Sequence, residues 1–415
     1  MYTNGEQHIR ELARRVREAA HTPENIDKMK RYEDINALRT VIPPVSVSLP
    51  YQVSKLLADP LDFRTQEPYL RALEEDLAYR LARLDKLPDD TPVSSKVYTG
   101  FVSSVSEWKE GYHSVRLNER KEATCFKPCI HLPEDYQTLK TPVLSFDETL
   151  TGQNFQKMQN LLGDILTVVK GAPFTSVCGW GSSMVDQLVE MRGLEGFYYD
   201  MHDHPEAIHS AMEFMVQGHL RLLEEYEKLG MLVANNGINH VGSCSFGLSA
   251  ELGVPSDQNG PVTPLNLWGY AHAQELASVS PDMLEEFVLP YQARILNRFG
   301  LNAYGCCEEI ENKIDVVARH IDRLRMISIS PTTNPEIAGE KCRGKYVYAW
   351  KTLPANIAYF NEQAIENEFR RVLENTKGCC VTVNIMDVYE CGEDISRFTK
   401  AIRIAREMID RYYSV

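Results

Sequence analysis

The sequence predicts an α/β protein built as a (β/α)8 TIM barrel with an N-terminal helical extension. At 415 residues the chain exceeds the roughly 250 residues that such a barrel needs, which leaves room for added segments. Its 43% hydrophobic and 25% charged residues are typical of a packed globular protein. Segments of strand length alternate with helical patterns along the chain, as parallel strands with helical crossovers require. A doubly wound sheet joined to a helical domain stays open as the competing arrangement.

Residues 1–40 form the predicted helical extension. Ile9, Leu12, Ala13 and Val16 recur at the spacing of one buried helical face. The barrel is expected over residues 41–415. Residues 103–160 are long for a single connection, so we expect them to form an insertion over one face of the barrel.

Eight segments of strand length follow the extension. They are residues 45–48, 97–102, 165–170, 232–235, 299–304, 325–328, 346–350 and 381–386. The strongest helix is expected over residues 281–299. Ser280 is its N-cap, Pro281 its first residue and Gly300 its stop, and Pro290 should kink it.

Composition excludes several classes of partner. Asp and Glu number 58 against 44 Lys and Arg, a net charge of −14, which argues against nucleic acid or an anionic membrane as the main partner. No apolar run reaches the ~18 residues of a membrane-spanning helix, and the N-terminus lacks the apolar core of a signal peptide. A cytoplasmic protein is therefore expected, with its ten cysteines mostly reduced.

In a barrel, the chemistry lies at the carboxyl ends of the strands. Polar and nucleophilic side chains follow four of the predicted strands. They are Asn235, Asn236 and His240 after the fourth, Tyr304, Cys306, Cys307 and Glu308 after the fifth, Trp350 and Lys351 at the seventh, and Asp387 after the eighth.

Two adjacent thiols and a carboxylate directly after a strand favour a zinc site. Cys306, Cys307, Glu308 and Asp387 are the predicted ligands, because thiolates and carboxylates bind zinc and an open site needs about three of them. Adjacent side chains on an extended strand point to opposite sides, so both thiols can bind one ion only if the backbone turns. The alternative is that both thiols are core residues.

The other candidates take supporting roles. Glu308, His240 and Tyr304 are predicted to act on protons or to orient the substrate. Asn235, Asn236, Trp350 and Lys351 are the expected substrate contacts.

Weaker motifs favour ordinary structural roles. Residues 339–345 match G-x4-G-K, but a strand follows where a phosphate loop needs a helix, so nucleotide binding is rejected. Cys379 and Cys380 precede the last strand and are expected to pack in the core. Cys125, Cys129 and His131 have metal-like spacing but no second pair.

Several segments resemble the uroporphyrinogen decarboxylase-like barrels, a superfamily that includes methylcobamide methyltransferases. They are MKRYEDINALRTVIPPV (29–45), LWGYAHAQE (267–275), SPDMLEEFVLPYQARIL (280–296), YGCCEE (304–309) and KYVYAWKTLPANIA (345–358). The arginine-rich motif of the decarboxylases is absent from the sequence. The methyltransferases carry H-x-C and a later cysteine as zinc ligands. Here Tyr304 stands at the histidine position, Cys306 matches the first cysteine and Asp387 falls near the second.

The resemblance implies a corrinoid-dependent methyltransferase component. It would move a methyl group between a small methylated substrate, such as an O-methyl compound, and the cobalt of a separate corrinoid protein, with zinc as a Lewis acid. The chain has no D-x-H-x-x-G motif of its own, so the corrinoid would arrive on the partner. Dimers are common among such barrels, so a homodimer stays open.

Two other functions stay open. One is a metal-independent decarboxylase or lyase that uses Glu308, Asp387 and Lys351 as acid–base groups. The other is a non-catalytic binding protein.

Overall fold

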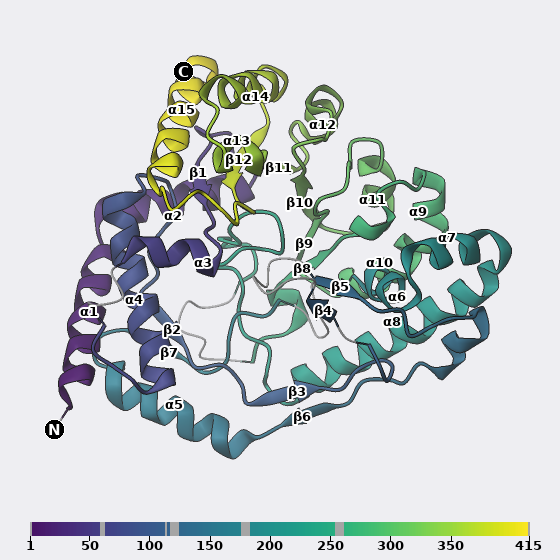
Figure 1. Cartoon of the computed structure of the whole chain (residues 1–415), viewed down its shortest axis with the longest axis horizontal. Coiled ribbons are helices and arrows are strands. Elements are labelled where there is room, and N and C mark those ends of the chain that lie inside the picture. Colours follow the sequence, from purple (N-terminus) through teal and green to yellow (C-terminus); the bar gives the residue numbers. More distant parts are fainter. Residues whose placement is uncertain are drawn as a thin grey trace.

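The computed structural model describes residues 2–58, 63–112, 114–116, 124–175, 183–253 and 261–413. The strands of the main sheet lie on the inner side of the helices that surround them (Figure 1). The predicted α/β fold class with a helical N-terminal region is therefore confirmed.

Six parallel strands form the main sheet. In spatial order they are β1 (Val45–Val47), β12 (Cys380–Ile385), β11 (Val347–Lys351), β10 (Leu324–Ile329), β9 (Leu301–Tyr304) and β8 (Trp268–Ala271). Because all six run in one direction, their carboxyl ends lie on the same side of the sheet. Side chains that follow these strands therefore come together.

Alternation along the strands decides which side chains reach the interior of the barrel. On β11, Val347 and Ala349 pack with interior residues such as Met326, whereas Tyr348 and Trp350 pack in the cluster under the helices. The period of two then places Lys351, the last residue of β11, on the interior side.

The remaining wall of the barrel contains β2 (Lys96–Tyr98) and β7 (Thr167–Val169), a parallel pair. The extended segment 231–235 lies between β7 and β8. The Phe174 amide donates to the Val233 carbonyl at 3.0 Å. The Asn235 side chain donates to the carbonyls of Phe174 and Trp268 at 2.9 and 3.0 Å and accepts from the Trp268 amide at 2.9 Å.

The predicted fourth strand at residues 232–235 is wrong. This segment has no regular ladder, because the Asn235 side chain replaces the backbone in bonding to β8. The neighbouring strand is β8, a short apolar run interrupted by Gly269, which the sequence pattern did not reveal. The other seven predicted strands each overlap an observed one.

The N-terminal region contains α1 (Asn4–Ala20) and α2 (Pro23–Asn36). Thr3 and Glu6 form a capping box at the start of α1. The predicted apolar face of α1 packs in one cluster with Leu77 of α4 (Pro68–Lys86) and Leu162 of α5 (Glu148–Leu162). Arg10 pairs with Asp164 at 2.6 Å and joins α1 to the end of α5.

Further helices cover the strands (Figure 1). They are α3 (Tyr51–Ser54), α6 (Met184–Arg192), α7 (Leu194–Asp203), α8 (Pro205–Lys228), α11 (Ile314–His320), α12 (Pro335–Cys342), α13 (Pro354–Ala358), α14 (Glu362–Asn375) and α15 (Ser396–Tyr413).

The helix predicted over residues 281–299 is broken into α9 (Pro281–Phe287) and α10 (Leu289–Leu296). Ser280 caps α9, and its side chain accepts from the Met283 amide as predicted. The break falls at Val288, two residues before Pro290, in agreement with the predicted kink.

Two antiparallel strand pairs lie within residues 103–160. One pairs β3 (Ser103–Val105) with β6 (Leu144–Phe146), and the other pairs β4 (Ser114–Arg116) with β5 (Thr124–Phe126). The first runs along the lower edge of the view in Figure 1. In the part of the chain that the structure describes, no helix is both long and apolar enough to cross a lipid bilayer.

Candidate active site

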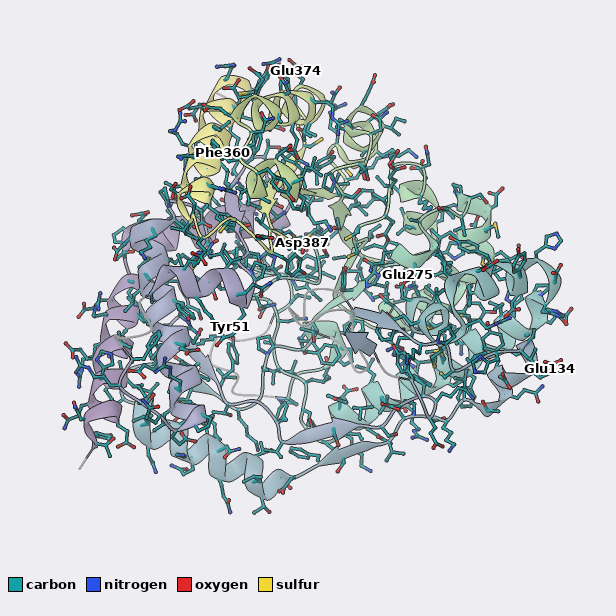
Figure 2. All side chains as sticks on the ribbon, viewed as in Figure 1. Tyr51, Glu134, Glu275, Phe360, Glu374 and Asp387 are labelled. Atoms are coloured by element: carbon teal, nitrogen blue, oxygen red, sulfur yellow. The ribbon has the colours of Figure 1, made fainter. Side chains whose placement is uncertain are left out.

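A cavity of about 690 Å³ lies at the carboxyl ends of the central strands. Each of four strands contributes lining residues directly at or after its end: His272 after β8, Cys306 and Cys307 after β9, Lys351 of β11, and Asp387 after β12. Asp387 lies near the middle of the molecule in Figure 2. This is where barrel enzymes carry their chemistry.

A turn at Gly305 brings both thiols to the cavity. Its φ of 99° lies in the left-handed region, and a Cβ there would come 3.1 Å from the Ser328 carbonyl oxygen, so only glycine fits without strain. The turn removes the alternation that would separate Cys306 from Cys307. Their sulfur atoms lie 3.7 Å apart, and both residues line the cavity.

Lys351 supplies positive charge to this thiol pair. Its Nζ lies 3.5 Å from the Cys307 sulfur and donates to Ser243 Oγ at 3.0 Å. Burial opposes the charged form of the amine, but the neighbouring thiols and Asp387 outweigh it and raise the pKa of Lys351. Lys351 is therefore a fixed ammonium group beside Cys307.

The two thiols have different pKa values. A hydrogen bond from the Cys306 thiol and the charge of Lys351 lower the pKa of Cys307 to about 6, although burial acts in the opposite direction. The same hydrogen bond and burial raise the pKa of Cys306 far above its usual value. At neutral pH, Cys307 is therefore the thiolate and Cys306 the thiol that donates to it.

His272 and Asp186 form a buried pair on the cavity wall. Nδ1 of His272 lies 2.8 Å from Oδ2 of Asp186, whose other oxygen accepts from the Glu275 amide. Burial disfavours a charged imidazole, but the contact with Asp186 outweighs it and raises the pKa of His272 to about 9. His272 is thus an imidazolium at neutral pH, held by a carboxylate.

An aromatic and acidic wall faces the cavity from residues 103–160 and from α6. The rings of Tyr112 and Phe126 stack with centroids 5.6 Å apart. The Tyr112 hydroxyl donates to Glu190 of α6. Asp186 and Glu190 are four residues apart on this helix, so both lie on its cavity side.

Glu308 does not line the cavity. Its side chain is buried, and its two oxygens accept from the backbone amides of Ala273, at 3.2 Å, and Cys306, at 2.7 Å. Glu308 therefore holds the segments after β8 and β9 together, and with them His272 and the two cysteines.

Replacing Glu308 with alanine is expected to lower the free energy of unfolding by roughly 2–4 kcal/mol, because two buried amides lose a charged acceptor. Denaturant unfolding measures the effect. The neighbouring Glu309 is exposed, so Glu309→Ala is the matched control and should change stability by less than about 0.5 kcal/mol. Equal stability of the two variants would contradict the role given to Glu308.

Two other predicted residues face away from the cavity. Trp350 packs against Phe369 of α14 with ring centroids 4.8 Å apart, and the buried Tyr304 donates its hydroxyl to Gln292 of α10 at 2.9 Å. Both are on the helix-facing side of their strands, one position from the side that Lys351 and Ala303 occupy.

The residues predicted after the fourth strand also lie outside the cavity lining. Asn235 makes the structural bonds described above, and Asn236 donates to the Ser249 carbonyl. His240 packs against Phe246, with ring centroids 4.4 Å apart, and burial lowers its pKa to about 4. His240 is therefore a neutral imidazole in a loop whose Val241 and Cys244 pack with interior residues of the barrel.

No zinc site is seen among the described residues. No three His, Cys, Asp or Glu side chains converge as metal ligands in this part of the chain. Both Glu308 oxygens already accept backbone amides, and the Lys351 ammonium lies beside the Cys307 sulfur, where it supplies the positive charge that zinc would bring. Of the predicted ligands, Cys306, Cys307 and Asp387 line the cavity. Their three side chains do not converge on one point, so they do not fit an open zinc site.

Among the weaker motifs, Cys379 and Cys380 are buried, as the packing interpretation expects. The side chain of Cys125 lies outside the described residues. Asp200, His202 and His204 also have a metal-like spacing, D-x-H-x-H, but Asp200 pairs with Arg192 at 2.7 Å, which gives it a structural role.

Sequence reasoning missed His272, Asp186, Glu190 and Tyr112. His272 directly follows β8, so locating that strand would have revealed it. The spacing of Asp186 and Glu190 on a helix was a second available signal. Tyr112 lies in an irregular segment and gave no periodic signal.

No protein-family model matches this chain, and no curated protein sequence matches it. Among solved structures, the chain is similar to a methyltransferase from Methanosarcina mazei, with a TM-score of 0.47 and 11% sequence identity. The similarity covers 93% of this chain and 99% of that one. Similarity at this level does not establish a shared function.

Proposed function

We propose that this chain is a methyltransferase component in which the Cys307 thiolate accepts the methyl group. The supporting observation is the thiol pair itself: one sulfur with a lowered pKa, facing a cavity of substrate size and flanked by an ammonium group. The sequence resemblance to methylcobamide methyltransferases supports the same class of reaction. The second methyl carrier is the cobalt of a corrinoid protein that docks at the open end of the cavity.

In the first transfer, the Cys307 sulfur attacks the methyl carbon of a donor. A sulfur–carbon bond forms, the bond between the methyl group and its leaving atom breaks, and the bonding electrons stay on that atom. The imidazolium of His272 is placed on the cavity wall to protonate the freed lone pair.

In the second transfer, an electron pair of the methyl acceptor, which reduced cobalt of the corrinoid partner would supply, forms the new bond to the methyl carbon. The sulfur–carbon bond breaks, and its electrons return to the Cys307 sulfur. The interactions that lower the pKa of Cys307 also stabilise this departing thiolate, since Cys306 donates to it and Lys351 lies 3.5 Å away. A pKa near 6 thus suits the Cys307 sulfur both as the nucleophile of the first transfer and as the leaving group of the second.

Free methylcobalamin provides the test of this function. Under anaerobic conditions, we expect the thiolate to displace cobalt(I) and the Cys307 peptide to gain the mass of one methyl group in place of its proton. Mass spectrometry and the cobalt absorbance report the two products. The transfer should persist after treatment with a metal chelator. Intact methylcobalamin together with an unmodified Cys307 would contradict the proposal.

A metal-independent lyase is the second candidate, and the His272–Asp186 pair is the observation that favours it. With Lys351 and Asp387 it gives the cavity the acid and base groups that a lyase requires. In that case no methyl group would reach Cys307 from any donor.

A further inference from the structure

The cavity carries more negative than positive groups on its wall. Its lining carboxylates are Asp186, Glu190 and Asp387, and its cations are His272 and Lys351. Asp186 neutralises His272 at 2.8 Å, and the charge of Lys351 is matched by Cys307 and Asp387. The Glu190 carboxylate has no cationic partner, since no ion pair involves it among the residues that the structure describes.

Glu190 lies beside the two stacked rings. It accepts from the Tyr112 hydroxyl through one oxygen, and Tyr112 stacks on Phe126. A carboxylate next to aromatic faces binds methylated ammonium groups well, because the ring faces attract the cation without having to replace a strong hydration shell. An anionic ligand would meet the same carboxylate and be repelled.

The thiols line the same cavity as this carboxylate and these rings. Tyr389, a third aromatic residue of the lining, is close enough to Cys307 and Asp387 for both to affect its pKa. The cavity volume of about 690 Å³ accommodates a small organic cation.

We propose that this cavity binds a methylated ammonium compound, with Tyr112 and Phe126 against its methyl groups and Glu190 as its counter-ion. The binding of this cation does not depend on the proposed function. Its role as the methyl donor does. Transfer then leaves an amine whose lone pair was released when its bond to the methyl carbon broke.

Calorimetric titration tests the binding separately from any transfer. The probes are choline and its uncharged carbon analogue, in which a tert-butyl group replaces the trimethylammonium group. We expect choline to bind at least about tenfold more tightly than the analogue. Equal affinities, or no measurable binding of choline, would overturn the inference.

Variants of the acidic wall sharpen the test. Glu190→Gln keeps the shape and the acceptor for Tyr112 but removes the charge, and should weaken choline binding about tenfold without affecting the analogue. Tyr112→Leu should weaken it by a similar factor. Glu195→Gln, on the exposed face of the next helix, is the matched control and should leave binding unchanged. A Glu190→Gln variant that binds choline normally would contradict the assignment.

The pH dependence gives a readout that misfolding would not produce. Burial raises the pKa of Glu190 to about 7, so choline should bind more tightly as pH rises through 7 and the carboxyl loses its proton. The charged and titratable groups that affect Glu190 are Tyr112, Asp186, His272 and Glu275. The rise should be absent in Glu190→Gln. A rise of the same size in that variant would overturn the role of Glu190.

The two proposals fail in different ways. Tight choline binding without methylation of Cys307 by any donor would contradict the proposed methyl transfer and support the proposed cation site. Methylation of Cys307 by methylcobalamin in a protein that does not bind choline would support the methyl transfer and contradict the cation site.

Discussion

Replacing Cys307 with alanine is expected to reduce methyl transfer by at least ~10³-fold, because the variant loses the atom that forms the new bond. The measurement is the rate at which methylcobalamin is consumed under anaerobic conditions. Cys306→Ala should be slower than the wild type but still active. It loses only the donor that lowers the pKa of Cys307, and the methyl group should still be found on Cys307.

Cys342→Ala is the control for loss of a thiol. This residue is buried in α12, away from the cavity lining, so its replacement should leave the transfer rate within about twofold of the wild type. Wild-type activity in the Cys307→Ala variant would refute the nucleophilic role and favour the lyase.

The second large effect is expected from Lys351→Met, which keeps a long unbranched side chain and removes its charge. Without the ammonium group 3.5 Å from its sulfur, Cys307 should have a higher pKa, and transfer at pH 7 should fall roughly 10–100-fold. Much of the loss should be recovered near pH 9, where the thiolate forms without assistance. The pH profile of the transfer rate measures both effects.

Lys345→Met is the matched control, because Lys345 is exposed and lies just before the opposite end of β11. It should transfer methyl groups at the wild-type rate at every pH. A Lys351→Met profile that is lowered equally at all pH values would show that Lys351 acts on something other than the thiolate.

Much of the barrel could be predicted because its strands are buried apolar runs separated by amphipathic helices. Seven strands were found in this way, as were the capping of α9 and the break before Pro290. β8 was missed because a strand of four residues that includes Gly269 has little hydrophobic pattern. The strand predicted at 232–235 was wrong because the Asn235 side chain, and not the backbone, forms the hydrogen bonds to β8.

The site was predictable to the extent that it follows strand ends. Cys306, Cys307, Lys351 and Asp387 line the cavity because parallel strands end on the same side. Trp350 and Tyr304 sit one position away from the interior, and a single position reverses the direction of a side chain. The role of Glu308 could not be inferred, since its partners are backbone amides brought close only by the fold.

The ionisation of Cys307 tests the central claim most directly. The rate of its alkylation by iodoacetamide, followed by mass spectrometry of the Cys307 peptide between pH 4 and pH 10, reports the thiolate fraction. The structure predicts an inflection near pH 6, because Cys306 and Lys351 stabilise the anion. An inflection at the ordinary thiol value of about 8.5 would contradict the account.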